Sequence, residues 1–154
     1  MTSPHMKTIA VIPARMGSSR FPGKPIATLH GRPMLEHVYK RVALSPSLDE
    51  TYIATCDEKI KQVAEKFGAK VIMTADTHER ASDRVAEAIA HIEADLIVMV
   101  QGDEPMTHPD MIDTAVKPFL NDVPRLPMNP SRTPQIYFSD SLLIVFSVFM
   151  FKTS

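Results

Sequence analysis

The stretch "KTIAVIPARMGSSRFPGKP", Lys7 to Pro25, joins an apolar segment to a loop rich in positive charge. Its first part, Lys7 to Pro13, is mostly apolar and β-branched and ends in proline, which predicts a buried strand followed by a loop. The fourteen residues from Ile12 to Pro25 hold three cations, two glycines and three prolines. Proline and glycine at this density exclude a helix. The sequence therefore predicts a cationic loop at the carboxyl end of a buried strand.

Beyond this loop, short apolar segments alternate with segments of helical periodicity as far as about residue 120. The expected strands are residues 7–13, 51–55, 70–73 and 96–100, and the expected helices are residues 33–44, 56–67, 82–92 and 109–120. Thr55 and Glu58 have the spacing of a capping box, so Thr55 is expected to cap the second helix. The alternation predicts an α/β fold: a Rossmann-like, doubly wound, mainly parallel sheet with helices on both faces.

Composition and charge limit the classes of function. The chain has 154 residues, enough for one domain, and its 17 basic and 18 acidic residues give a net charge of -1. This balance argues against nucleic acid or an anionic membrane as a partner, so an anion site must be a local cluster. The single cysteine, Cys56, excludes an internal disulfide framework. The apolar run at 142–151 is about half the ~20 residues that span a bilayer, and a signal peptide is not recognised, so a cytoplasmic protein is expected.

The pattern changes near Asn121. Residues 123–135 are rich in proline and lack periodicity, and residues 138–154 contain an apolar run without turn residues or an amphipathic face. That run is either a buried strand or an exposed tail. We expect residues 1–121 to form an incomplete nucleotide-binding domain, and residues 122–154 to be irregular and foreign to its fold.

The cationic loop is a candidate anion site, because open α/β sheets bind ligands beside the carboxyl ends of their strands. Its glycines and serines allow backbone N–H groups to approach an anion, and its three cations suit a triphosphate. The residues assigned to it are Arg15, Gly17, Ser18, Ser19, Arg20, Gly23 and Lys24. A Walker A loop is excluded because five residues, not four, separate the two glycines, and the dinucleotide fingerprint is absent. A basic surface turn without a ligand is the alternative.

A carboxylate follows the most apolar of the expected strands, in "VQGDEP", Val100 to Pro105. Asp103 and Glu104 are expected at the same edge of the sheet as the cationic loop, where Asp103 would hold Mg²⁺ together with substrate phosphates. The alternative is that Asp103 only caps a turn. After the third expected strand, Asp83 and Arg84 either contact nucleotide or sugar or are charges of the first helical turn.

Four segments together resemble the 3-deoxy-manno-octulosonate (Kdo) cytidylyltransferase family, also called CMP-Kdo synthetases. They are "IPARMGSSRFPGKP", "DEKIKQVAEKFGAKVIMT", "SDRVAEA" and "VQGDEP", and they follow one another in that family's order. The resemblance covers residues 7–120. It implies the nucleotide-diphospho-sugar transferase type of fold, here truncated. It also implies transfer of CMP from CTP to an eight-carbon acidic sugar, Kdo, with release of pyrophosphate, for the synthesis of lipopolysaccharide precursor.

The resemblance also implies a Mg²⁺ cofactor, a homodimer and roles for single residues. Arg15, Arg20 and Lys24 match triphosphate-binding positions, to which we give the catalytic role, and Asp103 matches a metal-binding aspartate. The substrate-binding positions are Ala14, Gly17, Ser18, Ser19, Asp83, Arg84 and Gln101. This chain departs from the family where Cys56 replaces an aspartate, where Arg80 and Ala81 replace serine and glycine, and after Asn121, where the family's later half is not recognised.

Two other functions remain open at this stage. One is a nucleotide-binding fragment or pseudoenzyme that binds CTP without turnover. The other is a related cytidylyltransferase that uses another sugar acid or another nucleotide.

Overall fold

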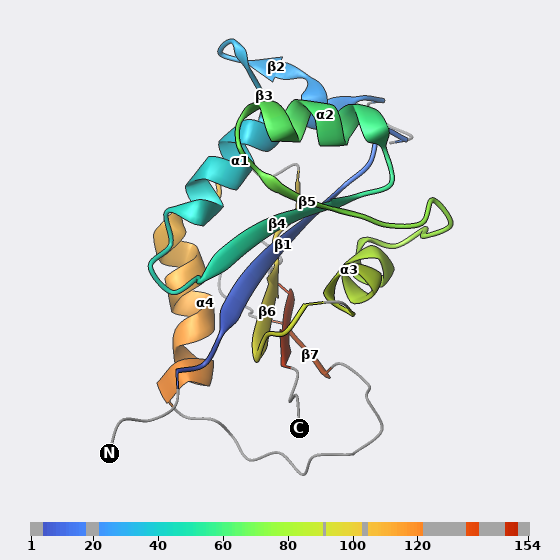
Figure 1. The fold of residues 1–154 in the computed structure, drawn as a ribbon. Helices are drawn as coiled ribbons and strands as arrows, with labels where there is room; N and C mark the ends of the chain where they lie inside the picture. The colour runs from blue at the N-terminus through green and yellow to red at the C-terminus, as the bar shows by residue number, and fades with distance from the viewer. Residues whose placement is uncertain are drawn as a thin grey trace.

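A computed structural model describes residues 5–17, 22–90, 92–102 and 105–121, together with the backbone of two later strands. Its six-stranded sheet has the order β5-β4-β1-β6-β8-β7 (Figure 1). The strands are β1 (Thr8–Ala14), β4 (Glu50–Thr55), β5 (Lys70–Met73), β6 (Leu96–Met99), β7 (Gln135–Phe138) and β8 (Ser147–Met150). The helices are α1 (Met34–Ala43), α2 (Glu58–Lys66), α3 (Ala81–Ile89) and α4 (Pro109–Asn121). A 3₁₀ turn, η1 (Lys24–Ile26), and a hairpin of β2 (Thr28–Leu29) and β3 (Arg32–Pro33) lie between β1 and α1.

The first four strands of the large sheet are parallel, which confirms the predicted fold class. β1 pairs with β4 on one side and β6 on the other, with Ile9 opposite Glu50 and Thr8 opposite Leu96. β5 extends the sheet beyond β4. All four strands therefore point the same way, and the loops that follow them emerge at one edge. In Figure 1 this edge carries α2 and the β2–β3 hairpin.

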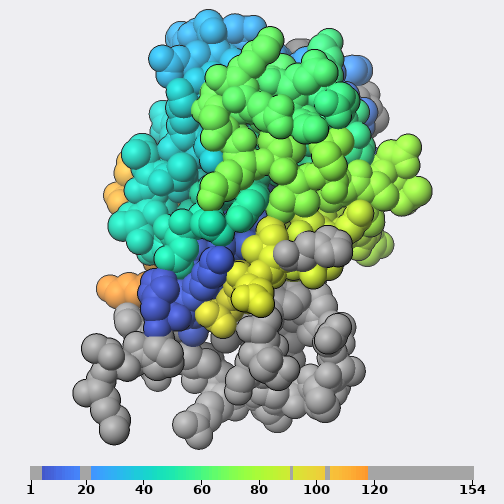
Figure 2. All heavy atoms as spheres, viewed as in Figure 1, coloured from blue at the N-terminus to red at the C-terminus, as the bar shows by residue number. Residues whose placement is uncertain are grey.

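Helices cover both faces of the sheet, as the alternating pattern predicts. Along β1, Ala10 and Ile12 face one core with α1, α2 and α4, whereas Ile9 and Val11 face a second core with α3. All four of these side chains are fully buried. In the space-filling view, the green and yellow-green residues of α2, β5 and α3 form a continuous surface on one side of the molecule (Figure 2).

Several element boundaries differ from the sequence predictions by a few residues, and two of the differences have a clear physical cause. Asp57, not Thr55, occupies the N-cap position of α2, because Thr55 Oγ1 instead accepts the Asp57 N–H at 3.1 Å. α3 ends at Ile89 rather than at Ile92. Ile92 nevertheless packs against the same core as α3, which explains why the apolar periodicity continues past the helix.

The segment after residue 121 contains two strands where we expected irregular structure. β8 pairs antiparallel with β6, with Ser147 opposite Met99, and β7 pairs with β8. Without β8, β6 would be an edge strand with unpaired backbone groups. Pairing with β8 satisfies these groups. At Ser147–Met150, within the apolar run, the strand alternative applies. The rest of 122–154 lies outside the described residues, and the division of the chain at residue 121 stays a prediction.

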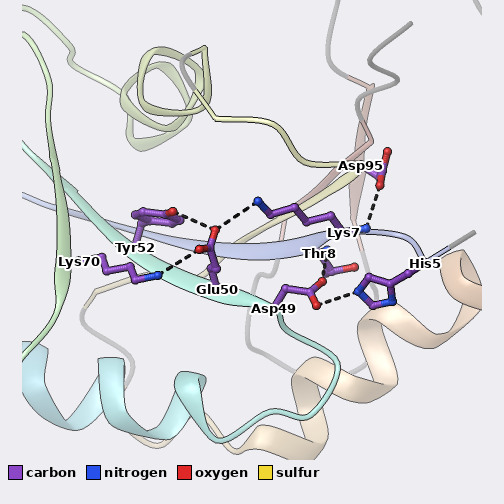
Figure 3. A network of polar contacts seen from close by, with 8 residues as sticks. All are labelled: His5, Lys7, Thr8, Asp49, Glu50, Tyr52, Lys70 and Asp95. Atoms are coloured by element: carbon purple, nitrogen blue, oxygen red, sulfur yellow. Dashed lines mark hydrogen bonds and ion pairs between the residues drawn. The ribbon is translucent and has the colours of Figure 1, made fainter.

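At the amino ends of the parallel strands, charged side chains bond to backbone N–H groups of β1 and the residue before it (Figure 3). Asp49 accepts the Thr8 N–H at 2.8 Å and lies 2.8 Å from His5 Nε2. Asp95 accepts the Lys7 N–H at 2.8 Å. Burial alone would raise the pKa of Asp49, but the hydrogen bonds from Thr8 and His5, with nearby positive charge, lower it below its ordinary value.

Glu50 forms a second group of contacts at the same end of the sheet (Figure 3). Its carboxylate accepts hydrogen bonds from Lys70 Nζ at 3.0 Å and Tyr52 Oη at 2.9 Å, and it lies 3.5 Å from Lys7 Nζ. The bonds from Lys70 and Tyr52 hold the pKa of Glu50 below its usual range. These contacts join β1, β4 and β5, so this end of the sheet is held together by paired charges.

Candidate functional site

The loop after β6 meets the end of β1 at the carboxyl edge of the sheet. Gly102 lies so close to the end of β1 that a Cβ atom there would be 2.9 Å from the Pro13 carbonyl oxygen and 3.8 Å from Ala14 Cβ. A contact under about 3 Å with backbone cannot be relieved by a side-chain rotation, so this approach requires glycine. The glycine of "VQGDEP" therefore brings that segment directly against the start of the cationic loop.

The cationic loop is closed at its base by a backbone hydrogen bond. The Gly23 N–H donates to the Met16 carbonyl at 3.0 Å, and Gly23 has a φ of 74°, a left-handed conformation that favours glycine. The next residue, Lys24, begins η1, whose Pro25 is buried. The loop thus leaves and re-enters the fold at one point, with Lys24 half-buried beside that point.

The structure places five of the proposed site residues at or beside this edge. Ala14 is buried at the end of β1, Arg15 and Gly17 are exposed just beyond it, and Lys24 and Gln101 are half-buried. Ser18, Ser19, Arg20 and Asp103 lie outside the described residues. Their assignments stay predictions.

Asp83 and Arg84 are neighbours in the first turn of α3 but have different surroundings. Asp83 is exposed, as expected of a first-turn charge. Arg84 is only 3% exposed, and its Nε has no hydrogen-bond partner among the described residues. A buried unpartnered N–H costs about 1–3 kcal/mol. Arg84 is therefore no ordinary surface charge, and its unsatisfied donor is consistent with a ligand contact.

The connection between β5 and α3 is held onto α3 by Glu87. Its carboxylate oxygens accept the Ala75 N–H at 3.1 and 3.2 Å and contact His78 Nε2. The hydrogen bond from His78, followed by that from Ala75, keeps the pKa of Glu87 below its ordinary value. This arrangement fixes the segment that leads to Asp83 and Arg84.

Two residues near the cationic loop were not predicted as site residues. The Asp57 carboxylate accepts the Met16 N–H at 2.7 Å. Lys59 lines a hollow of about 600 Å³ beside the loop. The other residues that line this hollow are Met16, Gly17, Pro22, Gly23, Ile26 and Ala27. In the sequence both residues lie where the second helix is expected, and their proximity to the loop arises from chain segments far apart in sequence.

Cys56 lies between Thr55 and Asp57 at the same edge and is half-buried. Its Sγ is 3.8 Å from Asp57 Oδ2.

Among the described residues, no group of three or more His, Cys, Asp or Glu side chains is arranged to hold a metal ion. Mg²⁺ does not require such a group, since it is usually bound by one or two carboxylates plus substrate phosphates. No helix in the same part of the chain is both long enough and apolar enough to cross a membrane.

The sequence also matches the model of a known protein family. The model of a family described as cytidylyltransferase matches residues 9–144. The chain belongs to the cytidylyltransferase family. The match continues into the segment that contains β7.

Individual relatives give the same family in more detail. A 3-deoxy-manno-octulosonate cytidylyltransferase of Geobacter metallireducens is 50% identical over 117 residues, which is 76% of this chain and 46% of the relative. The enzyme of that name from Syntrophotalea carbinolica is 45% identical over 135 residues, or 88% of this chain and 54% of the relative. The chain therefore spans about half the length of these curated relatives.

Solved structures support the same fold. The structure of a CMP:2-keto-3-deoxy-manno-octonic acid synthetase complexed with CTP has a TM-score of 0.77 and 32% identity. The alignment covers 94% of this chain and 74% of that one. A cytidylyltransferase from Leptospira borgpetersenii has the same TM-score at 24% identity, over 95% of this chain and 61% of that one. At that identity the second likeness shows the fold alone.

Proposed function

We propose that this chain carries the CTP-binding part of an enzyme that transfers CMP from CTP to Kdo and releases pyrophosphate. The observation that carries this proposal is the close approach of Gly102 to Pro13, which brings the start of the "VQGDEP" segment against the end of β1, where the cationic loop begins. Membership of the cytidylyltransferase family supports the choice of nucleotide. The names of the most similar relatives support the choice of sugar and a place in lipopolysaccharide precursor synthesis.

In this reaction the anomeric hydroxyl of the sugar attacks the α-phosphorus of CTP. A new P–O bond forms while the bond from the α-phosphorus to the bridging oxygen breaks, and that oxygen leaves with pyrophosphate. Catalysis of such a transfer depends on positioning and on stabilisation of charge more than on covalent participation by the protein. We accordingly assign the catalytic role to three cationic residues: Arg15, Arg20 and Lys24.

The other site residues would bind substrate or metal. Ala14, Gly17, Ser18 and Ser19 would hold the nucleotide through the loop backbone, and Gln101, Asp83 and Arg84 would contact nucleotide or sugar. Asp103 would hold Mg²⁺, which supplies charge neutralisation at the phosphates when bound. An enzyme that consumes CTP works where CTP is available, so the expected cytoplasmic location belongs to the same proposal. The homodimer implied by the resemblance stays a prediction.

A second candidate is CTP binding without turnover. In that case CTP would bind at the carboxyl edge of the sheet and no pyrophosphate would be released.

Calorimetry and a pyrophosphate assay distinguish these functions. We expect the full chain to bind CTP in the presence of Mg²⁺. Pyrophosphate release that depends on added Kdo would establish transfer, and CTP binding without release would select the second candidate. A panel of nucleoside triphosphates and sugar acids would reveal a related specificity. Absence of binding to every nucleoside triphosphate would refute both.

A further inference from the structure

Asp57 occupies the N-cap position of α2 without capping that helix. An N-cap aspartate usually accepts a hydrogen bond from an N–H in the first turn of its own helix, which stabilises the helix by about 1 kcal/mol. Here the Asp57 side chain makes no such bond. Its carboxylate instead accepts the Met16 N–H at 2.7 Å, from a segment 41 residues earlier in the chain. The contact therefore stabilises the cationic loop rather than α2.

Met16 is held through both of its backbone polar groups. Its N–H donates to Asp57, and its carbonyl oxygen accepts the Gly23 N–H at 3.0 Å. These two bonds lie at the point where the loop leaves β1 and returns to η1. Asp57 is itself fixed from behind, because its own N–H donates to Thr55 Oγ1 at the end of β4. A continuous series of hydrogen bonds thus runs from β4 through Asp57 to both ends of the loop.

We propose that Asp57 is a positioning residue for the cationic loop. By fixing Met16 it holds the loop in the geometry that accepts a triphosphate, so it acts on nucleotide affinity through the backbone and not by contact with the nucleotide. This inference rests on the proposed function for the identity of the ligand. The anchoring itself rests only on the hydrogen bonds of the protein.

Charge distinguishes this role from a direct one. A carboxylate beside a triphosphate repels it, so the negative charge of Asp57 gives no benefit to nucleotide binding unless the carboxylate binds a metal. A hydrogen-bond acceptor is all that the anchor requires, and an asparagine side-chain oxygen supplies one. Asp57→Asn should therefore preserve the loop, whereas Asp57→Ala should release it. A metal ligand would be impaired by both substitutions, because asparagine as well as alanine removes its charge.

The test compares the wild-type chain with Asp57→Ala, Asp57→Asn and the control Glu58→Gln. Glu58 is the adjacent carboxylate, and its side chain is 63% exposed and lies 3.8 Å from Lys61 Nζ. The first readout is hydrogen exchange at the Met16 and Gly23 amides without ligand. We expect both amides to exchange faster in Asp57→Ala and to stay protected in the other variants. Thermal melts monitored by circular dichroism establish that each variant is folded.

The second readout is the affinity for CTP, or the KM for CTP if the chain turns over. Since misplacing a binding loop by about 1 Å can cost up to 100-fold, we expect Asp57→Ala to weaken CTP binding about tenfold with little change in kcat. Asp57→Asn should remain within about threefold of the wild type, because it retains the acceptor.

Three results decide the matter. Equal exchange at Met16 in the wild type and in folded Asp57→Ala would overturn the anchor. Loss of Mg²⁺-dependent activity in Asp57→Asn, equal to that in Asp57→Ala, would replace the anchor with a metal-binding role. If the wild-type chain binds no CTP, the proposed function fails, and the exchange rates at Met16 and Gly23 alone decide whether Asp57 fixes the loop.

Discussion

The two ends of the parallel sheet use polar side chains in opposite ways. At the amino ends of the strands, Asp49, Glu50 and Asp95 bond to backbone N–H groups or to neighbouring side chains (Figure 3). At the carboxyl ends, Asp57 and Glu87 also bond to backbone N–H groups, but three buried polar side-chain atoms among the described residues have no hydrogen-bond partner. The first arrangement stabilises the fold, and the second leaves bonding capacity for something that is not part of the chain.

The unpartnered groups make this difference explicit. Within the described residues, three buried side-chain atoms have no hydrogen-bond partner: Thr74 Oγ1, Arg84 Nε and Thr107 Oγ1. Thr74 follows β5, Arg84 lies near the start of α3, which follows it, and Thr107 lies between β6 and α4. All three therefore follow the carboxyl ends of parallel strands. Unsatisfied buried groups cost stability, so these three atoms support the ligand site that we propose at this edge.

The largest effect is expected from Asp103→Asn. If Asp103 holds Mg²⁺ at the carboxyl edge, removal of its charge should abolish Mg²⁺-dependent pyrophosphate release without altering the thermal melt. Asp110→Asn, which removes an exposed carboxylate at the start of α4, is the matched control and should be active. Full activity of Asp103→Asn would remove the metal role.

Gly102→Ala should be nearly as severe, because it separates the two loops. The added methyl group would lie 2.9 Å from the Pro13 carbonyl oxygen, so one backbone segment must move. We expect a stability loss of about 1–3 kcal/mol, as for other overpacked sites, and CTP affinity about 100-fold lower. Gly17→Ala, with no atom within 4 Å of the new methyl group, is the control for stability. Unchanged CTP affinity in Gly102→Ala would show that the "VQGDEP" segment is not part of the CTP site.

The cations of the loop should each have an intermediate effect. Lys24→Ala and Arg20→Ala should each weaken CTP binding by about 1–3 kcal/mol, the scale for losing a charge-assisted hydrogen bond. Calorimetry measures this directly, with Lys117→Ala on the exposed surface of α4 as the charge-matched control. If both loop variants retain wild-type affinity, the loop is a basic surface turn and not a triphosphate site.

The smallest effect is expected at the amino end, on stability alone. The lowered pKa values of Asp49 and Glu50 mean that their stabilisation is complete above the unfolded values of about 4 and is lost as pH falls through the lower folded values. Glu50→Gln should cost at most about 1 kcal/mol at pH 7 and should flatten the loss of stability toward acid pH. Urea unfolding between pH 7 and pH 3 measures this, with the exposed Glu65→Gln as control. A change in CTP affinity in Glu50→Gln would contradict the separation of the two ends.

Much of the fold could be predicted because each strand and helix carries its own local pattern. The β-branched run of β1 and the helical spacing after Pro109 are properties of contiguous residues. The errors arose where a local signal had two explanations. Thr55 has the spacing of an N-cap but bonds the Asp57 N–H in a turn, and Ile92 continues the apolar period of α3 from outside the helix.

The candidate site was only partly predictable for a different reason. The position of the cationic loop follows from its place directly after β1, and the "VQGDEP" segment, with Asp103 and Glu104, was expected at the same edge because it follows another parallel strand. The bond from Met16 to Asp57 joins segments 41 residues apart, and the burial of Arg84 depends on how α3 packs against the sheet. Neither feature has a signature in adjacent residues.

The most direct measurement is a map of amide chemical-shift changes as CTP and Mg²⁺ are added to the full chain. The account predicts that the changes gather at the carboxyl edge, at Arg15 to Gly17, Gly23, Lys24 and Gln101 to Gly102, while His5 to Thr8, Asp49 and Glu50 stay unchanged. Shifts confined to the amino ends of the strands, or no shifts at saturating CTP, would contradict it.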